Sequence, residues 1–428
     1  MTSALRCSIV LILAIALCSC GAGKKAPEEG VTLTLYHWME KDRTIWEEGI
    51  IKPFEQSHPG VRVILQTSPY SLYVSKSLTS IASGSRLADV MYAEDWFGQE
   101  LIQKQYALNL MPYVRRDVAV DQFSAETFTE WRGAAQREDE LYGFPACLGL
   151  TVLFYNKELF DRAGLAYPDT TWTYDDLVRA GKRLTIVRDG VTEQWGLCFD
   201  IHYTGLETVI YSFGGRTLSE DGRHAALTEP NTVRGLQYIQ DIFLKHRIAS
   251  TTTSFINTFE PFLAQRAAMI LVGSLGAINL EGSPMRWDIT FPPKGPDGTR
   301  RSRRFTMAYM IPRNTPHPDE AWQLLHWILT KTPVALIDRQ YQGMMPTYKP
   351  FAGSSAWLNA KPLYDRRLLV GLEEGYAFPL FTPGWQEWRD NNLTPEMMLM
   401  IRGEKSVEEC AAAAQERINE VLQRAYAR

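Results

Sequence analysis

The feature that most constrains the fold is a near-continuous apolar run, "LTVLFYN", over residues 150–156. A strand with one solvated face alternates apolar and polar residues, whereas a strand covered on both faces is apolar almost throughout. The run follows Pro145 and Gly149, and a short helical pattern ending at Gly164 comes after it. The chain therefore predicts a sheet with helices on both faces.

The segments before this run follow the same logic. Residues 31–38 and 61–68 alternate as strands do, and a helical pattern with a Pro-Gly stop lies between them. An amphipathic helix with Tyr73, Leu78 and Ile81 facing inward comes next, and then a buried strand that ends at Tyr92. Strands that alternate with helices predict parallel pairing and an α/β fold.

Later segments continue the alternation. Thr173 and Asp176 have the spacing of a helix capping box. Further segments read as strands and then as long helices: strands at 195–201, 267–274 and 287–293, and helices at 318–330, 390–403 and 406–428.

Length and charge narrow the class of protein. A chain of 428 residues is too long for one ordinary core and suits two or three domains. A net charge of −4 argues against a nucleic-acid-binding protein, because such proteins usually carry a basic domain. After the first twenty residues, the cysteines are Cys147, Cys198 and Cys410, which form neither a disulfide framework nor a zinc-binding pattern. One pair could form a disulfide, and the sequence does not say which.

The first residues predict a targeting segment. An arginine and a short apolar run precede "LCSCGAG", and the run is shorter than the roughly 20 residues that span a bilayer. The pattern resembles the bacterial lipobox, which implies a signal peptide over 1–19, a lipidated Cys20 and a tether over 20–30. Cys18 departs mildly from that pattern. The alternative is ordinary signal cleavage, with Cys20 unmodified.

Several motifs in order resemble the extracellular solute-binding proteins of bacterial sugar ABC transporters, the group that contains the maltose-binding protein. They cover nearly the whole chain after the tether, and each is weak alone. The motifs are "PFEQSHPGVRV", "SGSRLADVMYAEDWFGQEL", "LYGFPACLGLTVLFYNKELFDRAGL", "PDTTWTYDDL", "YSFGGRTLSEDG", "AAMILVGS", "PDEAWQLLHWIL", "QGMMPTYKP" and "SVEECAAAAQERINEVL".

The resemblance implies a periplasmic-binding-protein-like fold, in which a hinge joins two α/β lobes around a ligand cleft. Pro145 and Gly149 suit the first crossing between the lobes, because hinges absorb backbone changes in a few residues. A second crossing is expected near residues 303–314. The implied lobes are an N-terminal lobe of 31–145 and 310–332 and a C-terminal lobe of 149–305 and 338–428.

Candidate ligand contacts lie past the carboxyl ends of two strands, where open α/β sheets bind ligands. His37, Trp38, Glu40 and Lys41 follow the first strand, and Glu94, Asp95 and Trp96 follow another. The resemblance places Asp95 on a cleft carboxylate and Trp96 beside it. Aromatic rings pack against the C–H faces of sugars, and buried hydroxyls need hydrogen-bond partners. The alternative is that Trp38 packs under its loop and Glu94 is solvated.

The resemblance implies further contacts nearer the C-terminus. Trp385 matches an aromatic residue that stacks on sugar, whereas Trp388 is expected in the core. Gly273 and Ser274 match a ligand-site loop. Two departures put maltose itself in doubt: Leu275 stands where tryptophan is common, and Gly149 where maltose-binding proteins have an acid. Other segments could reach the cleft or be ordinary loops: Asp200, His202 and Tyr203, and also Gly343 and Met344.

Other functions find little support. The run Arg300, Arg301, Arg303 and Arg304 could grip a phosphate or a partner, but a short basic run favours a solvated turn. No nucleophile elbow, zinc-protease, P-loop or dinucleotide motif is present in the sequence. Glu94 and Asp95 are adjacent, so they make a poor glycosidase pair. We therefore expect no catalytic residue, no metal and no cofactor.

The sequence thus predicts a lipid-anchored, monomeric substrate-binding protein of an ABC importer in the bacterial cell envelope. It would bind a carbohydrate between its lobes and deliver it to membrane permease subunits. Two alternatives stay open. One is a secreted enzyme that acts on glycans, and the other is a binding protein for another solute, such as a polyamine, iron or a phosphorylated sugar.

Overall fold

The computed structural model describes residues 30–38, 43–133, 136–202, 204–252, 258–280, 282–333, 336, 344–359, 382 and 384–427. Within these ranges the strands join into one sheet of 11 strands, with the main order β2-β1-β3-β10-β4-β8-β6-β5. The strands are β1 (Val31–His37), β2 (Val61–Thr67), β3 (Val90–Glu94), β4 (Phe144–Asn156), β5 (Ile186–Arg188), β6 (Val191–Phe199), β7 (Ala249–Ser250), β8 (Ala267–Gly273), β9 (Trp287–Thr290), β10 (Arg304–Met310) and β11 (Met345–Pro346).

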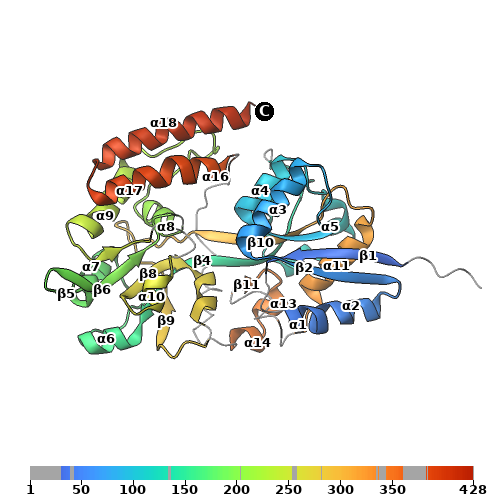
Figure 1. Ribbon diagram of the computed structural model, residues 1–428, viewed down its shortest axis with the longest axis horizontal. Helices are drawn as coiled ribbons and strands as arrows, with labels where there is room; N and C mark the ends of the chain where they lie inside the picture. Colours follow the sequence, from blue (N-terminus) through green and yellow to red (C-terminus); the bar gives the residue numbers. More distant parts are fainter. Residues whose placement is uncertain are drawn as a thin grey trace, which may run out of the picture.

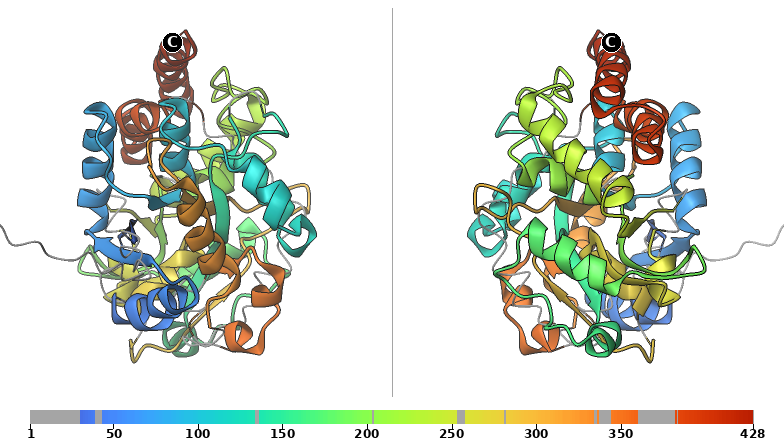
Figure 2. Two further views of the ribbon diagram at one scale, coloured as in Figure 1. Left: turned by 90° about the vertical axis from the view of Figure 1, so that its right-hand side faces the viewer. Right: turned by 90° about the vertical axis from the view of Figure 1, so that its left-hand side faces the viewer.

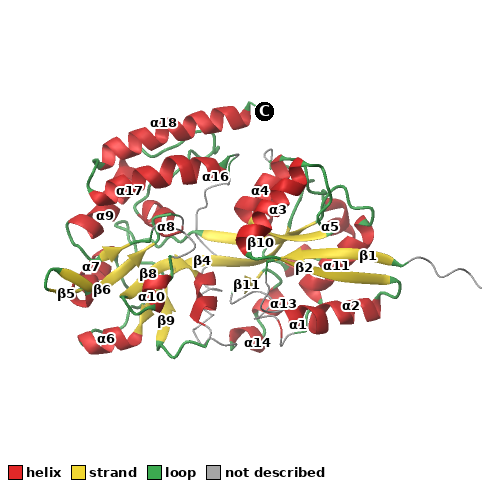
Figure 3. Cartoon of the chain, viewed as in Figure 1, coloured by secondary structure: helices red, strands yellow, loops and turns green. Residues whose placement is uncertain are grey.

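The helices lie on either side of this sheet (Figures 1, 2 and 3). They are α1 (Arg43–Ile45), α2 (Lys52–Ser57), α3 (Tyr70–Ala82), α4 (Asp95–Gln103), α5 (Met111–Asp117), α6 (Lys157–Ala163), α7 (Tyr174–Leu184), α8 (Thr204–Ser212), α9 (Pro230–Leu244), α10 (Glu260–Leu263), α11 (Pro318–Thr330), α13 (Lys349–Ala352), α14 (Ser355–Leu358), α16 (Trp385–Trp388), α17 (Thr394–Arg402) and α18 (Val407–Tyr426). Short 3-10 or π-helical segments include η3 (Ala125–Trp131), η5 (Ser274–Leu280) and η7 (Arg389–Leu393). No helix among the described residues has the length and apolar character needed to cross a membrane.

Local sequence signals explain where several elements begin and end. The Asn156 side chain accepts hydrogen bonds from two backbone N–H groups at the start of α6, and Gly164 ends that helix with a φ of +62°. Thr173 and Asp176 form the expected capping box of α7. The parallel pairing of β1 with both β2 and β3 confirms the alternating-element prediction, and β3 continues to Glu94, beyond the expected end at Tyr92.

Strand β4 links the two halves of the sheet (Figure 1). Phe144–Leu150 pairs antiparallel with β10, whereas Thr151–Asn156 pairs with β8 and β9. Pro145 and Gly149 both lie inside this continuous strand and not in a loop. The register with β10 shifts beside Pro145, at Met307 and Ala308, which fits a residue that has no N–H to donate. We call the side with β1–β3 the first half and the side with β5–β9 the second half.

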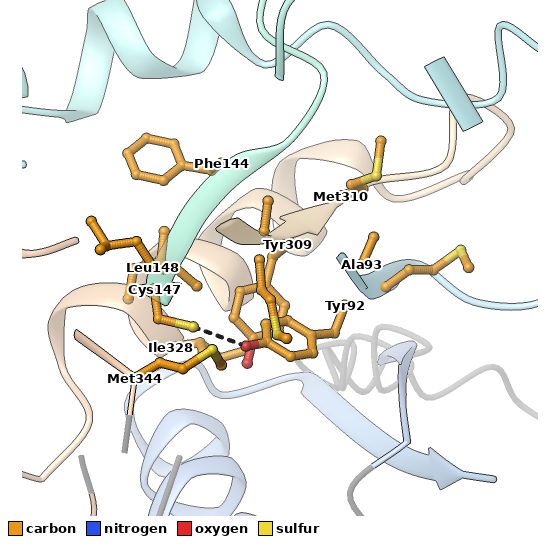
Figure 4. Packing of buried hydrophobic residues seen from close by; sticks show 14 of the residues in the cluster. Tyr92, Ala93, Phe144, Cys147, Leu148, Tyr309, Met310, Ile328 and Met344 are labelled. Atoms are coloured by element: carbon orange, nitrogen blue, oxygen red, sulfur yellow. Dashed lines mark hydrogen bonds between the residues drawn. The ribbon is translucent and has the colours of Figure 1, made fainter. Parts of the chain in front are cut away.

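Buried apolar side chains form two clusters. The first cluster is formed by side chains of the first half together with some from β4 and β8. The second is formed by other side chains of β4 and β8 and by those of α7–α9 and α16–α18. All residues of β4 are buried, as the apolar run predicts for a strand covered on both faces. In the first cluster Tyr92 and Tyr309 pack beside Cys147, whose Sγ lies 3.2 Å from the Tyr92 hydroxyl (Figure 4).

Candidate functional site

The candidate site is centred where β3 runs into α4. Glu94 ends β3 in an extended conformation, and Asp95 and Trp96 open α4. Helix α16, from the C-terminal part of the chain, begins at Trp385 directly after Gly384, whose φ of +73° favours glycine. These two helix starts carry side chains that meet.

Trp96 and Trp385 stack on each other. Their ring centroids are 5.6 Å apart and their planes differ by 28°. The Trp96 indole N–H donates a 2.6 Å hydrogen bond to Glu94, and the Arg389 guanidinium lies 4.0 Å from the Trp385 ring centroid. Three residues that the sequence predicts as ligand contacts (Glu94, Trp96 and Trp385) are therefore in direct contact.

Asp95 lies beside this pair and is buried. One carboxylate oxygen accepts from the Trp96 backbone N–H at 2.8 Å. The other accepts from the Thr306 backbone N–H at 3.3 Å and from Arg303 at 3.4 Å. Arg303 also donates to Glu207 of α8 at 2.7 Å. We call Asp95, Arg303 and Glu207 the buried triad; it connects α4, the segment before β10, and α8.

Charge in the buried triad is not balanced. Burial raises the pKa of Asp95 from 3.8 to about 7, because an ionised carboxylate loses its water, and Arg303 opposes this shift. Burial likewise raises the pKa of Glu207 against the effect of the same arginine. Within the triad, full ionisation would set two carboxylates against the one guanidinium of Arg303, while Arg389, outside the triad, also lowers the pKa of Glu207. The triad is neutral when one carboxylate holds a proton.

A second ion pair lies next to the triad. Arg304 and Glu130 are 2.5 Å apart at their closest atoms, and both side chains are nine-tenths buried. The Thr306 hydroxyl donates to Glu130 and accepts from the Trp131 indole N–H. These contacts join η3 to β10.

The expectation of a solvated turn for the arginine run is wrong for Arg303, which is 2% exposed, and for Arg304. Only the start of the run follows it: Arg300 packs over the Phe291 ring and Arg301 pairs with Asp297. The reason is that β10 begins inside the molecule, where acidic side chains distant in sequence receive the charges.

Trp38 lies farther along the first half, past β1. Its ring packs at 4.8 Å from Tyr92 and at 5.2 Å, edge-on, from Tyr73. His37 stacks on Tyr92, and burial lowers the pKa of His37 to about 3. The predicted contacts Glu40 and Lys41 lie outside the described residues.

Gly273 and Ser274, at the end of β8, are positioned by hydrogen bonds to the start of α8 and to β4. The Gly273 N–H donates to the Thr204 hydroxyl at 3.1 Å, and the Ser274 hydroxyl accepts from the Leu150 N–H at 3.3 Å. The Phe305 ring packs against the Cα side of Gly273, and a Cβ at position 149 would lie only 2.1 Å from that ring. Gly149 leaves room for this ring, because Phe305 of β10 stands opposite Gly149 in the pairing with β4.

The remaining candidates divide. Asp200 is buried and accepts from the Thr204 backbone N–H and hydroxyl, and His202 bonds the Thr252 carbonyl. Met344 is buried, and Trp388 lies in the core as expected, donating to the Thr382 hydroxyl. Tyr203, Gly343 and Cys20 lie outside the described residues. Whether any of the predicted contacts touches a ligand stays a prediction.

The described residues contain no group of three or more histidines, cysteines or acids that could hold a metal ion. Cys147, Cys198 and Cys410 are free thiols and buried.

The sequence reasoning missed Glu130, Glu207 and Arg389. Glu207 had a usable signal, since it is an acid within the otherwise apolar or small stretch "TGLETVIYS" of α8. Arg389 stands four residues after Trp385, one helical turn away. Glu130 had no local signal, because its partner Arg304 is distant in sequence.

Comparisons with known proteins identify the family. Residues 39–335 match the bacterial extracellular solute-binding protein family. The galactooligosaccharide-binding protein of Bacillus subtilis is 23% identical over 320 residues, which cover 71% of each protein. An ABC substrate-binding protein from Listeria monocytogenes, solved with cycloalternan, has a TM-score of 0.80 at 19% identity and covers 92% of this chain and 99% of that one.

A structure of UgpB from Mycobacterium tuberculosis with glycerophosphocholine has a TM-score of 0.78 at 15% identity, with 92% and 98% coverage. Proteins of this one fold are thus solved with chemically different solutes. The sheet, the helix layers and the matched residues together show the periplasmic-binding-protein-like α/β fold, and the chain belongs to the bacterial extracellular solute-binding protein family.

Proposed function

We propose that this protein is the substrate-binding subunit of an ABC importer and that its solute is a carbohydrate. The observation that carries the proposal is the contact between Trp96 of α4 and Trp385 of α16. The two helices belong to different halves of the molecule, and the Glu94 carboxylate lies beside the contact. Indole faces stack on the C–H faces of sugars, and carboxylates accept from hydroxyls. The oligosaccharide named for the Bacillus subtilis relative supports a carbohydrate here.

The solute would lie between two lobes, 31–145 with 310–332 and 149–305 with 338–428. The proposed contacts are Trp38, Glu40, Lys41, Glu94, Asp95, Trp96, Gly273, Ser274 and Trp385. Closure of the lobes would bury the solute, and the solute would stabilise the closed form by binding it more tightly than the open form.

Delivery needs partners at the membrane. We propose a monomer that is anchored through a lipid on Cys20, stays in the cell envelope and hands its solute to permease subunits, without chemistry of its own. Cys20→Ala should release the protein from the membrane fraction, whereas Cys18→Ala should not. Equal retention of both variants would contradict the lipid anchor.

A thermal-shift screen tests the solute class. The protein, begun after Cys20, is heated with mono- and oligosaccharides, polyamines and glycerophosphodiesters. A ligand at 100 times its Kd stabilises the folded state by about 2.7 kcal/mol, which raises the melting temperature measurably. A selective rise with a saccharide that is recovered unchanged supports the proposal.

The other outcomes of the screen name the alternatives. A rise with polyamines or phosphodiesters alone would keep the family and replace the carbohydrate. Consumption of the saccharide during incubation would instead indicate a glycan-active enzyme.

A further inference from the structure

The Trp385 ring is covered by its neighbours. Trp96 stacks on it at 5.6 Å between centroids, and the Arg389 guanidinium lies over it at 4.0 Å. An indole and a guanidinium thus both pack on this ring. Trp388 packs edge-on at 6.3 Å, and Trp385 is 4% exposed. A sugar ring can stack on Trp385 only after one of these neighbours has moved.

Of the two covering groups, Trp96 belongs to the other half of the molecule. It is carried by α4, whereas Trp385 and Arg389 follow one another on α16 and η7. Trp96 is half-buried and packs against both hydrophobic clusters. Any movement of the two halves apart therefore separates Trp96 from Trp385, but leaves Arg389 with its neighbour.

Two hydrogen bonds fix the orientation of Trp96. Its indole N–H donates to Glu94 at 2.6 Å, and its backbone N–H donates to Asp95 at 2.8 Å. Asp95 is in turn held by Arg303 and Thr306. The Trp96 ring thus lies against Trp385 in a defined pose, supported from its own half.

We infer that Trp96 occupies the place on Trp385 where a saccharide would stack, so that Trp96 and the saccharide compete for this ring, while Arg389 holds the ring in position. The inference rests on the proposed carbohydrate function. It revises the role that the sequence predicts for Trp96 and that the proposed function gives it, from ligand contact to competitor, and keeps Trp385 as the stacking contact. The Trp96–Trp385 contact then lowers saccharide affinity by the free energy needed to part the rings.

The sign of one mutational effect tests this. Titration calorimetry with arabinotriose, galactotriose and maltotriose is compared for the wild type and for Trp96→Ala and Trp96→Leu. An aromatic pair contributes about 0.5–1.5 kcal/mol, so removal of the cover should tighten binding about two- to tenfold. Weaker or unchanged binding by both variants would overturn the inference while leaving the carbohydrate function intact.

A matched control separates this effect from loss of any tryptophan. Trp327 is also half-buried in the first half, and it packs against Phe54 and His58, away from the stacked pair. Trp327→Ala should leave saccharide affinity unchanged. An equal gain of affinity in Trp327→Ala would contradict the role given to Trp96.

A measurement without saccharide tests the contact itself. Stacked indoles couple their electronic transitions and give a paired positive and negative band in circular dichroism. Trp96→Ala should weaken that pair of bands, and Trp385→Ala should weaken it more, because it also removes the Trp385–Trp388 contact. Trp327→Ala should leave the bands as in the wild type. Bands of undiminished strength in both site variants would overturn the inference. Failure of the carbohydrate proposal is recognised separately, as no binding of any trisaccharide by wild type or variants.

Discussion

Two groups of ion pairs in this molecule contain buried carboxylates, but they differ in the ratio of acidic to basic side chains. Glu396 of α17 is 2% exposed and receives both Lys405, at 2.9 Å, and Arg417, at 3.1 Å, whose side chains reach solvent. In the buried triad two carboxylates share Arg303, and all three side chains are at most 5% exposed. The first cluster joins helices within one half, whereas the second lies where the halves meet.

The comparison teaches where charge can serve stability. In the Glu396 cluster water still hydrates both cations, so their pairing with the carboxylate costs little desolvation. In the buried triad the shared arginine is itself buried, so the desolvation of all three side chains is costly. Protonation of one carboxylate therefore changes the stability of the triad. Sensitivity of this kind belongs more often to a functional region than to a structural one.

The largest effect is expected from Arg303→Met. The change removes the cation that Asp95 and Glu207 share, and leaves Arg389 acting on Glu207 alone. Loss of one partner of a buried ion pair typically costs about 3–5 kcal/mol. Urea unfolding near neutral pH measures the loss. A variant as stable as the wild type would mean that the carboxylates are already protonated and that the triad is not ionic.

The next effect concerns pH. A folded-state pKa of Asp95 near 7, against 3.8, means that the folded protein binds this proton more tightly than the unfolded chain. The contribution of this proton to the free energy of unfolding is therefore fully present below about pH 4, and it is lost as the pH rises through about 7. At about 1.4 kcal/mol per pKa unit, the change amounts to at most about 4 kcal/mol.

Asp95→Asn should remove this dependence, because the amide mimics the protonated acid. Melting temperatures of both proteins, recorded from about pH 4 to about pH 8, measure how the stability of each depends on pH. If the two curves run parallel across that range, Asp95 does not titrate as inferred.

The smallest effect is expected from Arg417→Met. Glu396 keeps Lys405, and Arg417 is half-exposed, so the loss should be less than about 1 kcal/mol. The measurement is the same urea titration that is applied to Arg303→Met. Equal losses in the two variants would end the distinction between the clusters.

Local elements could be predicted from the sequence because their signals are local. The capping box at Thr173, the helix stop at Gly164 and the apolar run of β4 each depend on neighbouring residues. The pairing of Trp96 with Trp385 was not predicted as a contact, although each residue was singled out. The burial of Arg303 was missed, because its partners Asp95 and Glu207 are brought close only by tertiary structure.

The position of β10 has a consequence for the order of folding. β10 lies between β3 and β4 in the sheet, yet strands β5–β9 of the second half all precede it in the chain. Until Arg304–Met310 is synthesised, β3 and β4 each keep an open edge, and closing so long a loop is slow. The first half therefore cannot finish folding before most of the chain has been made.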